Sequence, residues 1–140
     1  MINANSTDKI SVVGLVEPVA SAATVTSGWV LAANAYSYLV AVQSGTAGTS
    51  VDAKIEQATD GSGTGAKDLS GSSITQLTAA GSAVIQFKAS DLDSANDFDY
   101  FRVSVTKVGA TSIASATVIA VDPRYAPLAD ASEIDEVVTV

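Results

Sequence analysis

The sequence has no cysteine and no histidine among its 140 residues. Without cysteine there is no disulfide, no thiolate nucleophile and no cysteine-ligated zinc. Without histidine the commonest general base and the commonest transition-metal ligand are missing, together with the usual Ser–His and Cys–His catalytic arrangements. Carboxylates, lysine and tyrosine are the groups left for catalysis. We therefore expect a protein that is not an enzyme and that uses no cofactor or metal.

Positive charge is also scarce, because 7 Lys and Arg stand against 15 Asp and Glu, for a net charge of −8. The basic residues are scattered singly, whereas binding to a phosphate backbone needs them clustered. No basic and apolar leader of the secretory type opens the sequence, and no apolar run is long enough for a membrane helix. We expect no direct nucleic-acid partner and no membrane partner.

Aromatic residues make up only 6% of the chain, and much of its 47% hydrophobic content is alanine. A domain of about this length still buries roughly 70% of the surface of its unfolded chain. The sequence is therefore long enough for one core without metal or disulfide.

The most regular stretch runs from residue 50 to residue 58. Its side chains alternate with a period of two, which is typical of a strand in a sheet with one solvated face. The two expected faces are Val51, Ala53, Ile55 and Gln57 on one side, and Asp52, Lys54, Glu56 and Ala58 on the other. The following segment, residues 59–65, holds only residues that favour surface turns.

Similar extended runs, separated by turn residues, occupy most of the chain up to residue 121. The most apolar, residues 36–42, is expected at the centre of a sheet, and residues 73–78 and 83–88 are expected to form a hairpin. Ser90 is expected to cap a single helical turn. The remaining runs cover residues 10–16, 19–26, 30–31, 98–108 and 112–121. Seven to eight strands without a long helix predict an all-β fold, an antiparallel β-sandwich or flattened barrel.

The composition changes after residue 121. Pro123 and Pro127 favour extended backbone, and an acidic and apolar tail follows them. We therefore predict a β-sandwich domain over residues 1–121, of which residues 1–9 are a flexible N-terminal segment, and an extended C-terminal arm over residues 122–140. The tail is either a frayed end or last edge strand of the same subunit, or an arm that adds to a neighbouring molecule.

Two groups of residues resemble ligand sites. Asp91, Asp93, Asp97 and Asp99 form a cluster of oxygen ligands suited to calcium, but the spacing does not match an EF-hand. We prefer a solvated turn whose charge Arg102 partly balances. The glycine-rich residues 61–65 before Lys67 resemble a phosphate-binding loop, but no Ser or Thr follows the lysine and no helix is predicted there, so we expect a surface loop.

Aromatic and arginine side chains are the candidate interface anchors, because they dominate the binding energy of protein interfaces. Trp29, the single tryptophan, is read as a plug at one end of the core or, alternatively, as an interface anchor. Arg124 and Tyr125, on the proline-flanked segment, are the better interface candidates, with packing on the same subunit as the alternative. The interface candidates are completed by Ile134, Val137 and Val138 of the apolar tail.

Three segments, residues 50–69, LDSANDFDYFRVSVT (92–106) and DPRYAP (122–127), resemble small virion proteins of tailed bacteriophages, typically encoded beside the major capsid protein. The resemblance implies a cement or decoration protein that is made in the host cytoplasm, binds the outer surface of the major capsid protein shell and stabilises it. It also implies a homo-oligomer, a trimer or another symmetric cluster. The alternatives are a head-to-tail connector or tail protein and, from a different class, a carbohydrate-binding β-sandwich.

Overall fold

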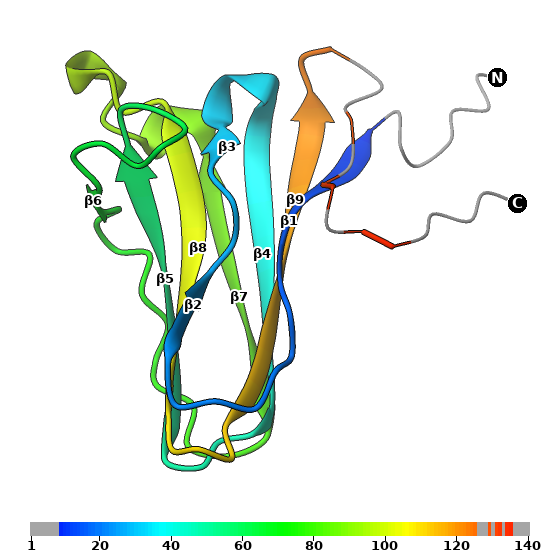
Figure 1. Ribbon diagram of the computed structural model, residues 1–140. Helices are drawn as coiled ribbons and strands as arrows, with labels where there is room; N and C mark the ends of the chain where they lie inside the picture. Colours follow the sequence, from blue (N-terminus) through cyan, green and yellow to red (C-terminus); the bar gives the residue numbers. More distant parts are fainter. Residues whose placement is uncertain (1–8, 126–128, 130, 133, 136–140) are drawn as a thin grey trace, which may run out of the picture.

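Two antiparallel sheets face each other in the computed structural model, which describes residues 9–125, 129, 131–132 and 134–135 (Figure 1). Sheet A has the strand order β1-β9-β4-β7, and sheet B has the order β2-β8-β5-β6, with β3 also paired to β8. Sheet A consists of β1 (Ile10–Val16), β9 (Ile113–Pro123), β4 (Ala35–Thr46) and β7 (Gly81–Lys88). Sheet B consists of β2 (Thr24–Thr26), β3 (Val30–Leu31), β8 (Tyr100–Val108), β5 (Ser50–Ala58) and β6 (Lys67–Asp68).

This architecture confirms the predicted all-β fold and selects the sandwich over the flattened barrel, because the strands form two separate sheets. The helical content of the described residues consists of short 3-10 turns. They are η2 (Ala32–Asn34), η3 (Ala89–Asp91) and η4 (Ser94–Asn96). The predicted strand over residues 36–42 is indeed central, since β4 lies between β9 and β7.

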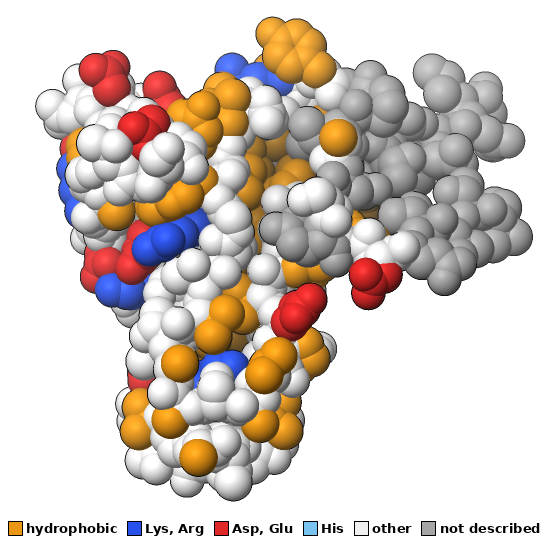
Figure 2. Space-filling model, viewed as in Figure 1, with side chains coloured by type: hydrophobic (Ala, Val, Ile, Leu, Met, Phe, Trp, Pro, Cys, Tyr) orange, Lys and Arg blue, Asp and Glu red, His pale blue; other side chains and the backbone are white. Residues whose placement is uncertain are grey.

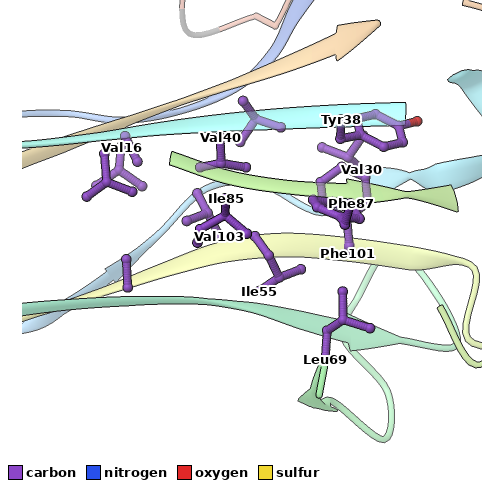
Figure 3. Packing of buried hydrophobic residues seen from close by; sticks show 14 of the residues in the cluster. Val16, Val30, Tyr38, Val40, Ile55, Leu69, Ile85, Phe87, Phe101 and Val103 are labelled. Atoms are coloured by element: carbon purple, nitrogen blue, oxygen red, sulfur yellow. The ribbon is translucent and has the colours of Figure 1, made fainter. Parts of the chain in front are cut away.

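The core lies between the sheets, where aliphatic side chains of both layers point toward one another (Figure 3). Part of the core is a cluster of three aromatic rings. The ring centroid of Phe101 lies 4.5 Å from that of Tyr38 and 4.9 Å from that of Phe87, both in edge-on geometry. Tyr38 and Phe87 stack at 5.4 Å. Because Phe101 comes from sheet B and the other two from sheet A, this cluster joins the two layers.

The Tyr38 hydroxyl is the one polar group inside the aromatic cluster, and it donates to the carbonyl oxygen of Ala32 at 3.0 Å. Burial raises the pKa of Tyr38 to about 12, since ionisation would leave a charge in the core. A neutral hydroxyl with a fixed acceptor satisfies the rule that buried polar groups are hydrogen-bonded.

The predicted faces of β5 are confirmed, except that Ala58 is buried as well. The predicted hairpin of residues 73–78 with 83–88 is wrong, because β7 pairs with β4. Residues 69–77 run along β5 instead: the Ile74 N–H donates to Ala53 O at 2.9 Å. Leu77 forms an isolated bridge with Val51. Of the predicted run 19–26, only β2 is a strand, because the chain first crosses from sheet A to sheet B.

Candidate assembly surfaces

The outer face of sheet A is almost free of charge. The strand registers align its outward side chains across the four strands, for example Val12 beside Ile119, Leu39 and Gln86. Among these outward positions Lys88, at one corner, is the only charged residue. The others are Ile10, Val12 and Leu15 of β1, Ile113, Ser115, Thr117, Ile119 and Val121 of β9, Ser37, Leu39, Ala41 and Gln43 of β4, and Ser82, Val84 and Gln86 of β7.

Several of these side chains are open to solvent. Val84 is 57% exposed and Ile10 is 41% exposed, although both are large and apolar. Single exposed apolar residues are ordinary, whereas a contiguous set on one face is typical of a contact surface. The outer face of sheet A is therefore the first candidate assembly surface.

The outer face of sheet B is built in the opposite way, from cross-strand polar pairs. Arg102 Nε donates to Glu56 Oε2 at 2.7 Å, and Lys54 Nζ lies 2.7 Å from Asp68 Oδ1. Gln76 donates to Asp52 at 3.0 Å. In Figure 2, blue and red side chains gather over β5 and β8, at the left of the view. Such a charged, internally paired face is suited to contact with water.

The sheets also differ in the protection of their edges. In sheet B, residues 67–77 run along the edge of β5, and β2 and β3 lie along β8. In sheet A, the Ala131 N–H donates to Val12 O of β1 at 2.7 Å. Among the described residues, no segment pairs with the outer edge of β7. An open edge presents unpaired backbone donors and acceptors, so β7 is the second candidate surface.

A groove lies beside this edge, between β7 and the segment after β6. Its volume is about 500 Å³, and its lining combines the apolar Ile85, Phe87 and Leu69 with polar groups. Gln57 lines the groove although only 5% of it is exposed, and its amide oxygen accepts the Asp93 backbone N–H at 2.9 Å. The groove thus offers apolar contact next to free backbone groups of β7.

The predicted interface residues after β9 lie in different settings. The Arg124 guanidinium carbon lies 4.5 Å from the ring centroid of Tyr36, and the Arg124 N–H donates to Asn34 O at 2.9 Å. Tyr125 is 79% exposed. The Ile134 N–H donates to Ala131 O at 3.1 Å in a turn. Val137 and Val138 lie outside the described residues, as does most of the predicted N-terminal segment 1–9.

Two members of the aspartate cluster, Asp91 and Asp93, have side-chain partners within the chain. Asp91 accepts the Lys88 backbone N–H at 2.8 Å, so Asp91, rather than the predicted Ser90, makes the side-chain contact at this turn. Asp93 pairs with Lys67 at 2.5 Å, and this hydrogen bond lowers the pKa of Asp93. Arg102 pairs with Glu56 and does not balance the cluster, which corrects the sequence expectation. In the part of the chain that the structure describes, no three acidic side chains stand close enough to hold a metal ion.

The glycine-rich loop uses its own carboxylate where a phosphate would bind. Asp60 Oδ1 accepts the N–H groups of Ser62 and Thr64 at 2.9 and 3.0 Å, and Oδ2 accepts the Thr64 hydroxyl at 2.6 Å. These bonds, with that to the Thr64 hydroxyl foremost, lower the pKa of Asp60. Two amides of the loop therefore already donate to the Asp60 carboxylate.

Trp29 is not the core plug that the sequence suggested. It is half-buried on the sheet B side, and the Arg102 guanidinium carbon lies 4.5 Å from its ring centroid. Gly63 packs closely against the same side chain: its φ is +87°, and a Cβ there would lie 2.8 Å from the indole. Trp29 therefore fixes the glycine-rich loop onto the charged face and is absent from the core cluster.

The sequence carried a signal for the outer face of sheet A that strand-by-strand interpretation missed. Residues 10–16, 35–46 and 113–121 contain no charged residue, whereas β5 alone contains three. When neither face of a strand carries a charged side chain, the pattern does not mark one face as solvent-exposed. Comparison of charge between strands, in addition to polarity within each, would have identified the face.

Within the described residues, no helix meets the length and hydropathy needed to span a membrane.

No protein-family model matches the chain, and no curated protein matches its sequence. Solved structures of similar shape include a chain of the Cowpea mosaic virus empty virus-like particle, with a TM-score of 0.49, 10% identity and coverage of 88% of this chain and 85% of that one. The Tobacco streak virus coat protein has a TM-score of 0.40, 9% identity and coverage of 96% and 99%. A CBM4 structure has a TM-score of 0.42, 16% identity and coverage of 78% and 67%. At this level of similarity, neighbours with such different names do not assign a function.

Proposed function

We propose that the chain is a non-enzymatic structural protein of a tailed-phage virion, a cement or decoration protein that binds the outside of the major capsid protein shell. The observation that carries the proposal is the uncharged outer face of sheet A in a chain of net charge −8. Charge is depleted from the centres of protein interfaces, and this face is depleted over four strands. The sequence resemblance supplies the shell as the partner.

The proposed mechanism is repeated weak attachment. The outer face of sheet A packs against the shell, while the paired charges of sheet B remain in water and keep neighbouring copies soluble. Because the shell repeats the same site by symmetry, many modest contacts act together and hold adjacent capsid subunits in place. No single contact has to be strong.

The copy number in purified particles tests this proposal. Quantitative mass spectrometry or gel densitometry against the major capsid protein is expected to give on the order of tens to hundreds of copies per particle, as repeated attachment requires. A count of about six or twelve would instead support the connector alternative. Absence from purified particles would exclude both virion roles.

A release experiment adds a functional readout. Particles stripped of this protein are expected to lose shell integrity at a lower temperature than complete ones, and purified protein added back is expected to restore the original temperature. Particles whose melting is the same with and without the protein would contradict a stabilising role, even if the protein is present in many copies.

A further inference from the structure

Apart from Lys88 at its end, and as far as the described residues go, the outer edge of β7 has none of the usual protections of an exposed strand edge. From Gly81 to Phe87 it contains no charged residue and no proline. Its register with β4 runs without a bulge from Ser44–Gly81 to Ser37–Lys88. Natural sheets block open edges with charges, proline or bulges, because free backbone groups otherwise recruit another strand. Such an unprotected edge indicates that β7 pairs with another strand in the assembled protein.

We propose that the strand it accepts is the C-terminal segment 137–140 of a second copy of this chain. The segment is Val137-Val138-Thr139-Val140, in which every residue is β-branched. Such residues favour extended backbone and pack well on a pleated surface. The segment carries no side-chain charge, in keeping with the uncharged edge that it is to join.

The same molecule's own C-terminal segment is too short to reach this edge. Ala131 is bonded to β1, and β7 lies on the opposite side of sheet A. A strand beyond β7 would lie four strand spacings from β1, about 19 Å at about 4.8 Å each. The turn from Ala131 to Ile134 spans at most about 7 Å, and three extended residues to Val137 add about 10 Å. The donor must therefore be another copy.

The two sides of an added strand find different surroundings. One side meets the groove lined by Ile85, Phe87 and Leu69, and the other continues the outer face of sheet A beside Val84 and Gln86. Val138 and Val140 share one side of the segment, and Val137 and Thr139 share the other. Backbone hydrogen bonds then supply affinity, and the aliphatic side chains supply complementarity.

This contact is head-to-tail, because the donor segment and the acceptor edge are different surfaces of the same chain. Contacts of this kind close into rings when the rotation between copies permits it, and otherwise produce open filaments. Through this contact, copies of the chain assemble into a homo-oligomer without another protein. This assembly does not depend on whether the partner of the outer face of sheet A is a phage shell.

The first test compares the full chain with a chain that ends at Asp135 and keeps every described residue. By light scattering coupled to size-exclusion chromatography, the full chain is expected to form oligomers whose population rises with concentration, and the shortened chain to remain monomeric with an unchanged melting temperature. A full chain that is monomeric at all accessible concentrations overturns the proposal. A shortened chain that still forms the same oligomers overturns it as well.

Cross-linking locates the contact, and the absence of cysteine from the natural sequence gives a clean background. The variants Q86C, on exposed Gln86 of β7, and T139C, in the tail, are mixed and treated with a short bismaleimide. A covalent dimer containing one of each is expected, with at least about tenfold less product when Q86C is replaced by T24C, on exposed Thr24 of β2. Equal products from both mixtures overturn the proposal. Copy-number measurements on particles test the proposed virion role separately.

Discussion

The two outer faces of the sandwich are made from strands of the same kind but carry opposite surfaces. On sheet B, Lys54, Glu56 and Arg102 pair with charges across or beside the strands. On sheet A, the corresponding positions are aliphatic or neutral, with Lys88 as the exception. Among the described strands, charge is therefore concentrated on the outer face of sheet B, and the outer face of sheet A is nearly uncharged.

The strand edges of the two sheets differ as their outer faces do. Residues 67–77 cover the edge of β5, and this cover includes Leu69, which is buried and belongs to the core cluster. β7 lies across the sandwich without a comparable cover among the described residues. Sheet B therefore limits new pairing, whereas sheet A leaves both a face and an edge for it.

The largest effect is expected from F101A. Phe101 is fully buried and contacts aromatic rings of the opposite sheet, so its removal leaves a cavity between the layers. Phe-to-Ala substitutions of this kind cost about 3 to 5 kcal/mol. Chemical denaturation monitored by Trp29 fluorescence measures the loss. A loss below about 1 kcal/mol would mean that the two sheets do not depend on a common core.

Much of the fold follows from alternation alone. β5 was predicted with its bounds because Asp52, Lys54 and Glu56 mark one face so clearly. β1 was also predicted with its bounds, and β4 was correctly placed at a sheet centre. These successes depend on local pattern, in which each residue reports its own side of the sheet.

What failed depends on contacts between distant segments. Residues 73–78 look like a hairpin partner of the next run, yet they cover β5, because the pairing of β7 with β4 cannot be read from neighbouring sequence. Lys107 is only 2% exposed, with its ammonium group bonded to Val19 O at 2.6 Å. Lysine side chains are seldom buried, and no prediction was made for this one, because its acceptor comes from the segment that crosses between the sheets.

The candidate surfaces, too, have some features that are visible in the sequence and others that depend on the fold. The neutrality of sheet A is visible in the composition of its strands, but the alignment of Ile119 with Leu39 and Val12 requires the sheet order. The open edge of β7 cannot be predicted from the sequence, because an edge is open only if no other segment pairs with it, and that depends on the whole fold. The sequence predicted Arg124 and Tyr125 as anchors, and their role in an interface remains a prediction.

The next largest effect is expected from V84E, which places a carboxylate on the edge strand β7 of the uncharged outer face of sheet A. Val84 is 57% exposed, so the fold is expected to tolerate the change. Burial of an unpaired charge against a partner costs a few kcal/mol, so particle binding is expected to weaken roughly 10- to 100-fold. Binding to stripped particles, measured by co-sedimentation, checks this.

The matched control for that variant is T24E, because Thr24 is exposed on β2 of sheet B. Both variants add the same charge to the same net charge, so a general electrostatic effect would affect them equally. Particle binding of T24E is expected to match the unmodified protein within about twofold. Equal weakening in both variants would remove the functional distinction between the two faces.

Alkaline pH is expected to destabilise the fold by ionising Tyr38, whose side chain is buried on the inner side of sheet A. The pKa of Tyr38 is about 12 because burial disfavours the phenolate, while an exposed tyrosine ionises near pH 10. The folded state therefore holds its proton more tightly, and this stability is present below about pH 10 and is lost as the pH rises toward 12. At pH 11 the loss of folding stability attributable to Tyr38 is about 1 kcal/mol. Y38F is expected to remove this part of the pH dependence in denaturation curves.

The smallest effect is expected from R102Q, on the charged side of the comparison. Arg102 pairs with Glu56 and lies over Trp29, but both partners of the ion pair are partly solvated, with side-chain exposures of 27% and 17%. Partly exposed pairs contribute up to about 1 kcal/mol, so stability is expected to fall by that amount while particle binding stays unchanged. A double-mutant cycle with E56Q isolates the pair from the stacking of Arg102 on Trp29, since stacking persists in E56Q and is lost in R102Q. If R102Q weakens particle binding as strongly as V84E, the charged face is itself a contact surface, and the division between the two sheets does not describe how this protein assembles.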